Sequence, residues 1–249
     1  MEFRPLPAAV AMRGTDAVDL PPVRALDVIL VVLVATACLL LVGWLVRDMA
    51  TTPALVVGLL TLQSVVVLAA VHFIVVRGRG IGWGRLGLRA APPRWHFAAA
   101  LTALVAVPMV ALLNLAMQWL MQWLADAPFR NPQIEFLAPA GFSWTAFAGM
   151  LFAAAIVGPI AEEVVFRGLL YSWLRRYLGA VASIPLSAAV FAAAHGIAML
   201  VPALLVNGVL LALLFERSRS LVPPIIAHGL FNAMMVIALY AVLAAGFIP

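Results

Sequence analysis

The chain has 249 residues, of which 66% are hydrophobic and only 10% are charged. A soluble domain is about 45–50% apolar and about 25% charged, so this chain cannot cover its surface with polar side chains. Its single cysteine, Cys38, excludes a disulfide framework and a thiolate metal cluster. Its net charge of +5 comes from arginines that lie mostly in short loops between apolar runs, which excludes a nucleic-acid partner as the simplest interpretation. We predict an integral membrane protein.

Seven apolar runs are candidates for membrane spans, each of which needs about 20 mostly apolar residues. The fourth run continues past two glutamates to Leu174, and the fifth and sixth runs are short enough to form a tight hairpin. The predicted fold is therefore all-α, a polytopic helical bundle of about seven transmembrane helices. The runs cover residues 28–46, 54–76, 97–125, 142–161, 178–194, 196–215 and the chain from Leu221 onward.

The arginines in the loops predict the orientation of the bundle. With the N-terminus inside, the arginine-rich loops all fall on the cytoplasmic side, and the opposite loops hold only Arg47 and Arg130. All fifteen basic residues are arginine, which is typical of a GC-rich, prokaryotic genome. We expect an N-in protein of the prokaryotic cytoplasmic (inner) membrane.

The chain divides into three parts by composition. We expect residues 1–24 to form a flexible cytoplasmic tail, residues 25–95 to form two N-terminal helices and a basic loop, and residues 96–249 to form the remaining helices. The basic loop carries Gly82, Gly84 and Gly87 in the GxGxxG spacing of dinucleotide sites. That motif has meaning only between a strand and a helix, so we interpret this segment as a flexible juxtamembrane loop.

Three ionised residues lie deep in apolar sequence: Glu162, Glu163 and Arg167. Each costs about 2.5–3.5 kcal/mol at the centre of a bilayer, so the chain must gain something by keeping them. Glu163 and Arg167 are four residues apart on one helix face, which predicts an ion pair that supports the local structure. Glu162 points about 100° away and is free to face a cavity. The alternative is a purely structural cluster of all three residues.

Polar groups on two further helices are expected at overlapping depths. Pro159 should kink its helix and leave the Ala155 carbonyl without a donor, which favours a wet cavity near Glu162. At ~1.5 Å per helical residue, Glu162 lies ~20 Å from the cytoplasmic loops, His195 ~23 Å, Asn232 ~17 Å and His228 ~10 Å. His228 and Asn232 share a helix face because they are four residues apart.

A glutamate, two histidines and an asparagine in a wet pocket suit hydrolysis. A carboxylate can take a proton from water, and a histidine can share or pass it on. A second histidine and an amide can donate hydrogen bonds to a developing oxyanion. These motifs contain no serine or cysteine nucleophile and no HExxH zinc helix, so direct attack by activated water is the simplest mechanism.

The pattern resembles the CPBP intramembrane proteases, which comprise type II CAAX prenyl endopeptidases and bacterial relatives with bacteriocin-processing and self-immunity roles. The matching motifs are Glu162-Glu163-x-x-x-Arg167, Phe191-x-x-x-His195 and His228-x-x-x-Asn232, within a core of residues 142–236. The resemblance implies that Glu162 activates water with His195 as its partner, that His228 and Asn232 form the oxyanion site, and that Glu163 and Arg167 support them. A zinc ion held by Glu162, His195 and His228 is the open alternative.

The resemblance implies an intramembrane endopeptidase whose partners are the lipid bilayer and a membrane-associated protein or peptide substrate. Because the chain is more compact than the eukaryotic branch of the family, we do not expect a prenylated substrate. A non-proteolytic immunity or scaffold protein that binds a peptide in the same cavity is one alternative. A small transporter is the other, although the two halves show no inverted repeat.

Overall fold

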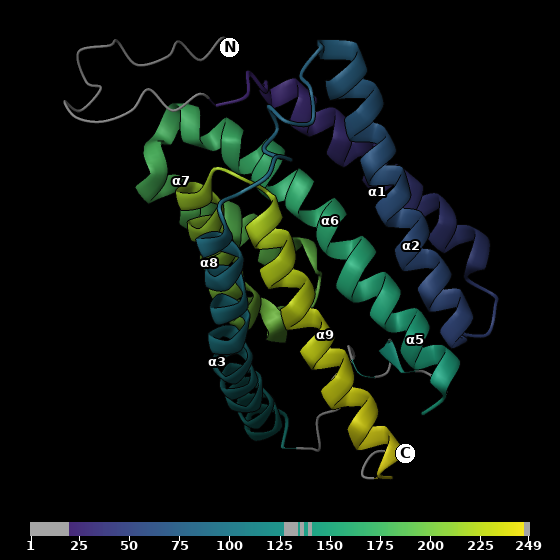
Figure 1. Ribbon diagram of the computed structural model, residues 1–249. Helices are drawn as coiled ribbons and strands as arrows, with labels where there is room; N and C mark the ends of the chain where they lie inside the picture. The colour runs from purple at the N-terminus through teal and green to yellow at the C-terminus, as the bar shows by residue number, and fades with distance from the viewer. Residues whose placement is uncertain (1–19, 127–133, 135–136, 139–140, 247–249) are drawn as a thin grey trace.

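The structure, a computed structural model, describes residues 20–126, 134, 137–138 and 141–246. Every regular element within these ranges is helical, which confirms the predicted all-α class. Figure 1 shows the elements as a bundle of long helices. In chain order they are α1 (Ala25–Val46), α2 (Pro53–Ala70), η2 (Val71–Arg77), α3 (Pro93–Ala125), α5 (Trp144–Phe152), η3 (Ala153–Val157), α6 (Gly158–Glu163), η4 (Val164–Tyr171), α7 (Ser172–Ala194), η5 (Ala198–Leu200), α8 (Val201–Ser218) and α9 (Val222–Ala244).

Six helical segments in the described residues are long and apolar enough to cross a membrane, against the seven predicted. The difference lies in Trp144–Ala194, a segment of 51 residues that contains both the fourth and the fifth expected spans. Two helices meet within it at Gly179, whose φ of 72° and ψ of 175° are not helical and are easily adopted by glycine. The kink at Gly179 falls at the boundary expected between the fourth and fifth spans, and the helix after it is shorter than the about 20 residues of a full span, so the number of spans stays a prediction.

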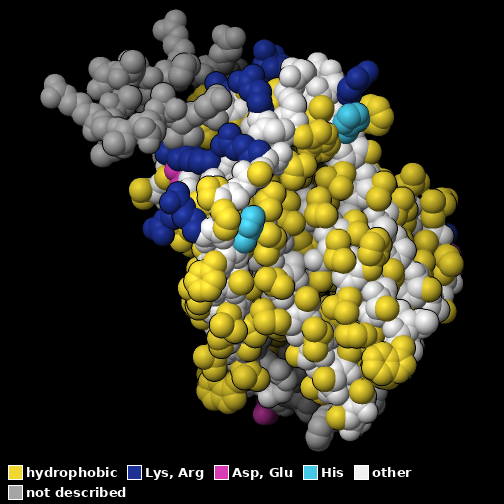
Figure 2. Space-filling view, in the orientation of Figure 1, with side chains coloured by type: hydrophobic (Ala, Val, Ile, Leu, Met, Phe, Trp, Pro, Cys, Tyr) yellow, Lys and Arg dark blue, Asp and Glu magenta, His cyan; other side chains and the backbone are white. Residues whose placement is uncertain are grey.

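The arginine side chains gather at one end of the molecule, and apolar side chains cover its flanks (Figure 2). This distribution is the one expected of a membrane protein whose arginine-rich loops share one side. The N-in orientation itself remains a prediction. Of the expected flexible tail, residues 1–19 lie outside the described residues, whereas Val23 is buried and the Pro21 carbonyl accepts a hydrogen bond from Arg176.

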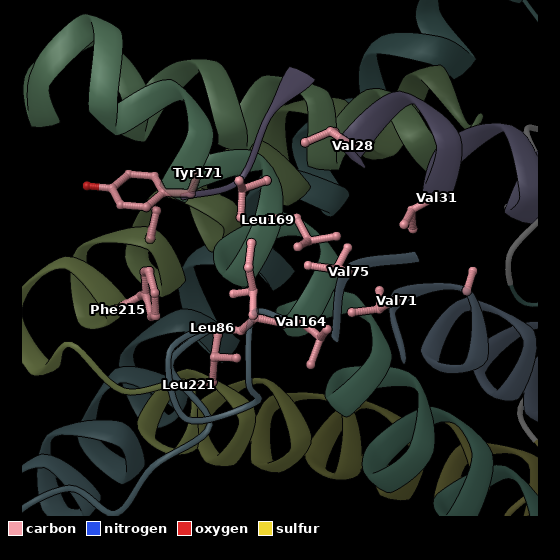
Figure 3. Packing of buried hydrophobic residues seen from close by; sticks show 14 residues of the cluster. Val28, Val31, Val71, Val75, Leu86, Val164, Leu169, Tyr171, Phe215 and Leu221 are labelled. Carbon is pink, nitrogen blue, oxygen red and sulfur yellow. The ribbon is translucent and has the colours of Figure 1, made fainter. Parts of the chain in front are cut away.

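The expected flexible loop is in fact packed into the core. Ile81 and Leu86 are buried in a cluster that also contains valines of α1, η2 and η4, and Figure 3 shows Leu86 next to Val164 and Leu221. The Leu221 amide donates to the Gly87 carbonyl at 2.8 Å. Gly87 has a φ of 104°, and a Cβ there would lie 2.9 Å from the Phe215 ring. The glycines therefore permit tight packing against the α8–α9 turn.

The helix that carries the last motif lies inside the bundle. In Figure 1, α9 runs between α3 and α8 on one side and the α5–α6 segment on the other, and it contacts α3, α5, η3, α6 and α8. Two π-helical stretches, η3 and η4, flank α6, which carries both glutamates. Because π-helical turns widen the backbone and often mark functional sites, α6 is the structural centre to examine.

Candidate active site

Glu163 and Arg167 form the predicted ion pair, and both side chains are fully buried. Arg167 Nη1 donates to Glu163 Oε1 at 2.7 Å. Arg167 Nη2 donates to the Gly208 carbonyl of α8 at 3.0 Å, so the pair joins α6 and η4 to a neighbouring helix. The guanidinium also lies 4.8 Å from the centre of the Phe191 ring. A buried charge pair needs such additional partners to offset its desolvation.

His228 lies between the two glutamates. Its Nδ1 is 2.9 Å from Glu163 Oε1, the same oxygen that Arg167 contacts. Its Nε2 faces Glu162 Oε2 at 3.8 Å. An ionised carboxylate only accepts hydrogen bonds, so Nδ1 carries the proton. In a neutral ring this leaves a lone pair on Nε2, and in the protonated ring Nε2 can also donate.

Glu162 differs from its neighbour in its exposure. About 35% of its side chain is accessible, whereas that of Glu163 is 0% accessible. Its Oε2 atom is nevertheless buried and has no hydrogen-bond partner among the described residues. The carboxylate thus has one oxygen directed toward His228 and remains accessible, as the helix-face argument predicts for a residue that faces a cavity.

Phe191 connects the two histidines of the site. Its buried ring lies 4.8 Å from the His195 ring and 5.8 Å from the His228 ring, between centroids. His195 Nδ1 is 2.9 Å from the Phe191 carbonyl. Because a carbonyl only accepts, this contact places a proton on Nδ1 and leaves a lone pair on Nε2 of the neutral ring. His195 is half-buried, at the end of α7.

Asn232 holds α9 against the π-helical stretch that precedes the glutamates. Its Nδ2 donates to the Ala154 carbonyl at 2.7 Å. The sequence argument named the neighbouring carbonyl, Ala155, because it assumed α-helical bonding. In a π-helix a carbonyl accepts from the fifth residue onward, so Pro159 leaves Ala154 without a donor. The Ala155 carbonyl instead approaches Gly229, where a Cβ would lie only 2.6 Å away.

The structure brings together Glu162, Glu163, Arg167 and His228 through direct contacts. His195 joins them through the Phe191 ring, and no hydrogen bond or ion pair connects it to Glu162 in the described chain. The pairing of Glu162 with His195 therefore remains a prediction. The oxyanion role of Asn232 also remains a prediction, and one N–H of its amide already donates to the Ala154 carbonyl.

Two residues of the site were not given a role by the sequence argument. Gly208 supplies the carbonyl that binds Arg167, and a Cβ there would lie 3.0 Å from Ala188 of α7. Phe191 supplies the ring between the histidines. The only signal in the sequence was the place of Phe191 in its motif and a glycine within an apolar helix.

The alternative of a zinc ion held by Glu162, His195 and His228 depends on how these three side chains are arranged. Within the described ranges, no group of three or more His, Cys, Asp or Glu side chains is arranged so that it could hold a metal ion. The set of Glu162, His195 and His228 therefore does not fit a metal as these side chains are placed, and we derive no step through one.

As an assembly, these residues can perform acid–base chemistry on water. A partly accessible carboxylate lies beside an imidazole nitrogen, and buried partners fix that imidazole. The imidazole of His195, on the other side of the Phe191 ring, has no hydrogen bond to its Nε2 atom in the described chain. Such pairs of positioned groups are the usual components of general acid–base catalysis.

Comparisons with known proteins match this part of the chain. Residues 143–234 match the family model of the type II CAAX prenyl endopeptidase Rce1-like proteins. The chain is 31% identical over 93 residues to the "Membrane-embedded CAAX protease MroQ" of Staphylococcus aureus (strain USA300). The aligned residues make up 35% of this chain and 38% of the relative. The chain thus spans well under half the length of the curated relative it matches. No solved structure matches it.

The matched segment contains all three motifs, from the α6 glutamates to Asn232. It also contains every residue of the described contacts around Glu163. The helices outside this segment, α1, α2 and α3, are apolar enough to span a membrane. Over residues 143–234 this integral membrane protein is therefore similar to the type II CAAX prenyl endopeptidases, which agrees with the resemblance that its three motifs carry.

Proposed function

We propose that this protein is an intramembrane endopeptidase that hydrolyses a peptide bond of a membrane-associated protein or peptide. The observation that carries the proposal is the accessible Glu162 carboxylate, which faces His228 Nε2 at 3.8 Å beside an ion pair buried in the bundle. The family match over residues 143–234 supports the same class of hydrolase.

In the proposed reaction, Glu162 takes a proton from a water molecule, and the oxygen of that water attacks the scissile carbonyl carbon. His195 assists through Nε2, the nitrogen that its contact with the Phe191 carbonyl leaves with a lone pair. The carbon–nitrogen bond then breaks as the departing amine receives the proton. The products are a carboxylic acid and an amine.

The oxyanion formed in this attack needs donors. Protonated His228 offers an N–H at Nε2, since Glu163 occupies Nδ1. Asn232 offers the second hydrogen of its amide, since the Ala154 carbonyl takes the first. Removing one such donor from an enzyme typically lowers kcat by about 10²–10³-fold. Glu163 and Arg167 support the site by fixing His228.

The first test compares new protein termini in prokaryotic membranes that contain wild type or Glu162→Gln at matched levels. Glutamine keeps the shape of the side chain but cannot take up a proton, so we expect the wild-type termini to disappear. Glu216→Gln is the matched control, because Glu216 lies in a separate charged cluster outside the site. Identical termini with wild type and Glu162→Gln would favour the immunity or scaffold alternative.

The second test concerns metal. Because the three residues of the zinc alternative do not fit a metal as placed, we propose that cleavage by the purified protein continues in a strong chelator. Loss of cleavage in chelator, restored by added zinc, would instead assign Glu162, His195 and His228 as ligands.

A further inference from the structure

Phe191 lies at the centre of the candidate site, although its ring has no acid, base or nucleophile to offer. Its side chain is fully buried near the end of α7. Four groups lie against its ring, namely the Arg167 guanidinium and the rings of Phe166, His195 and His228. A phenylalanine that only fills a core packs against apolar side chains, whereas three of these four neighbours are polar or charged.

The His195 imidazole depends on Phe191 for its position. Its Nδ1 lies 2.9 Å from the Phe191 carbonyl, and its ring centroid lies 4.8 Å from that of the Phe191 ring at an interplanar angle of 68°. Within the described ranges no other residue forms a hydrogen bond, an ion pair or a ring contact with this imidazole. The backbone and the side chain of one residue therefore decide where His195 Nε2 points.

His228 is held in a different way. Its Nδ1 lies 2.9 Å from Glu163 Oε1, so a charged partner fixes the ring without help from Phe191. Its ring centroid lies 5.8 Å from that of Phe191, a longer separation than the 4.8 Å of His195. Loss of the Phe191 ring should thus release His195 and leave His228 in place. A general loss of structure would not produce this difference between the two histidines.

The Phe191 ring is itself anchored to the charged cluster. The Arg167 guanidinium carbon lies 4.8 Å from the centre of the ring, close enough for the electrons of the ring face to attract the cation. The Phe166 ring lies 5.1 Å away at 89°, in the edge-to-face arrangement that aromatic pairs prefer. A Cβ at Gly208 would lie 3.2 Å from Phe191 Cδ1, so this glycine lets the ring lie close to the α8 backbone. Through the ring, these contacts connect His195 to the buried ion pair.

We infer that Phe191 is a positioning residue, whose ring sets the His195 imidazole relative to Glu162 and His228; this inference rests on the proposed function. In that reaction His195 Nε2 must face the water that Glu162 deprotonates, and a misplacement of about 1 Å can lower a rate about 10²-fold. No hydrogen bond or ion pair joins His195 to Glu162 in the described chain. The Phe191 ring, which contacts η4 and α9, is therefore what relates the two side chains in space.

The test observes the imidazoles by nuclear magnetic resonance of the purified full-length protein, labelled with nitrogen-15 in its histidines. The chain has four histidines, so the variants His195→Gln and His228→Gln assign the two relevant signals by their disappearance. In wild type we expect a proton fixed on Nδ1 of both rings. In Phe191→Leu we expect His195 to lose this single form and to exchange its proton between both nitrogens, while His228 keeps it.

The same variants are compared for the rate at which the wild-type protein termini appear in membranes, at matched levels of folded protein. Phe191→Leu should lower this rate about 10²-fold. The matched control is Phe215→Leu, which removes another buried phenylalanine ring, one that contacts the Tyr171 ring and neither histidine in the described chain. The control should leave the rate and both histidine signals unchanged.

A second replacement keeps the shape of the ring, in case leucine disturbs the packing. Phenylalanine with fluorine atoms on its ring has nearly the same size, but fluorine withdraws electrons from the ring face and weakens its attraction for a cation. At Phe191 each added fluorine should lower the melting temperature further. The same series at Phe215, which has no cation over its ring in the described chain, should not.

The outcomes separate positioning from packing and from catalysis. Unchanged His195 signals in Phe191→Leu would overturn the inference, and so would equal changes at His195 and His228, because the ring would then act on the structure as a whole. An unchanged rate of cleavage with His195 released, or a flat fluorine series at Phe191, would overturn it as well. If His195 is released while wild type and Glu162→Gln give identical termini, the positioning of His195 stands and the proteolytic function is rejected.

Discussion

Two charged clusters in this protein use the same kinds of side chain in different ways. The central cluster comprises Glu162, Glu163, Arg167 and His228. The end cluster comprises Tyr171, Arg175, Glu216 and Arg219, at the ends of η4 and α8 and the start of α7. In the end cluster both Glu216 oxygens are fully used: Oε1 accepts from two arginines, and Oε2 accepts from Arg219 and from the Tyr171 hydroxyl at 2.6 Å.

The central cluster is less completely bonded, although Glu163, Arg167 and His228 are more deeply buried than the charged side chains of the end cluster. Glu162 Oε2, Glu163 Oε2 and Arg167 Nε are all buried without a hydrogen-bond partner in the described chain. Native proteins leave few such groups, and each needs an explanation. A cluster that serves stability satisfies its atoms, as the end cluster does. The open atoms of the central cluster are what a reaction site would keep available for substrate and water.

The largest effect should follow from Arg167→Met, which leaves the Glu163 charge buried without its main partner. Breaking such a pair costs about 3–5 kcal/mol, or roughly 10 °C in the melting temperature of a protein of this size. Cleavage should fall as well, because Glu163 orients His228. Differential scanning calorimetry in detergent and an assay on the same preparation would measure both.

The matched control for that variant is Arg217→Met, which removes an exposed arginine near the end of α8 that has no hydrogen bond or ion pair in the described chain. We expect its melting temperature to change by no more than about 1 °C. Adding Glu163→Gln to Arg167→Met should recover part of the lost stability, because it removes the uncompensated charge. Lost cleavage at an unchanged melting temperature would contradict the supporting role and place Arg167 in the chemistry.

A smaller effect should follow from Asn232→Leu, which leaves the Ala154 carbonyl without its donor. An unsatisfied carbonyl costs about 1–3 kcal/mol, or roughly 5 °C. The change loosens the helix that carries Glu162, so we also expect at least a 10-fold loss of cleavage. An unchanged melting temperature together with lost cleavage would show that the amide acts on the oxyanion alone.

The smallest effect should follow from Glu216→Gln in the end cluster. Its side chain is 13% accessible, so solvent screens the pairs partly, and we expect a loss of about 1 kcal/mol or roughly 3 °C. The loss should shrink at high salt, and the rate of cleavage should stay within about twofold of wild type. A strong loss of cleavage at unchanged stability would erase the distinction between the two clusters.

Periodicity and composition predicted much of the fold, because a chain this apolar has no alternative to membrane helices. They were less informative where single glycines set the path of the backbone. The apolar run did not show that Gly179 is the residue at which the helices of the fourth and fifth expected spans meet. The glycines of the 77–94 loop suggested flexibility, whereas the buried Leu86 and the left-handed Gly87 show that they allow close packing.

In the candidate site, too, the sequence predicted the contacts within one helix but not those between helices. Helical spacing alone predicted the contact of Glu163 with Arg167 and the separate direction of Glu162, because both follow from about 100° per residue. It did not predict that His228 lies between the two glutamates, or that Phe191 contacts both histidines. Those contacts join helices that are far apart in the chain, and a local pattern contains no information about their relative rotation.

The sequence by itself therefore determined the membrane class, the helical content and the residues that carry chemistry, since these depend on the cost of charge in lipid and on the helical repeat. Only the tertiary structure decided which partner each of these residues has. In that structure His228 contacts Glu163 and faces Glu162, and the Asn232 amide donates to the Ala154 carbonyl. The reason is physical: packing of η3, α6 and α9 sets those distances, and the π-helical turn before Pro159 shifts by one residue the carbonyl that needs a donor.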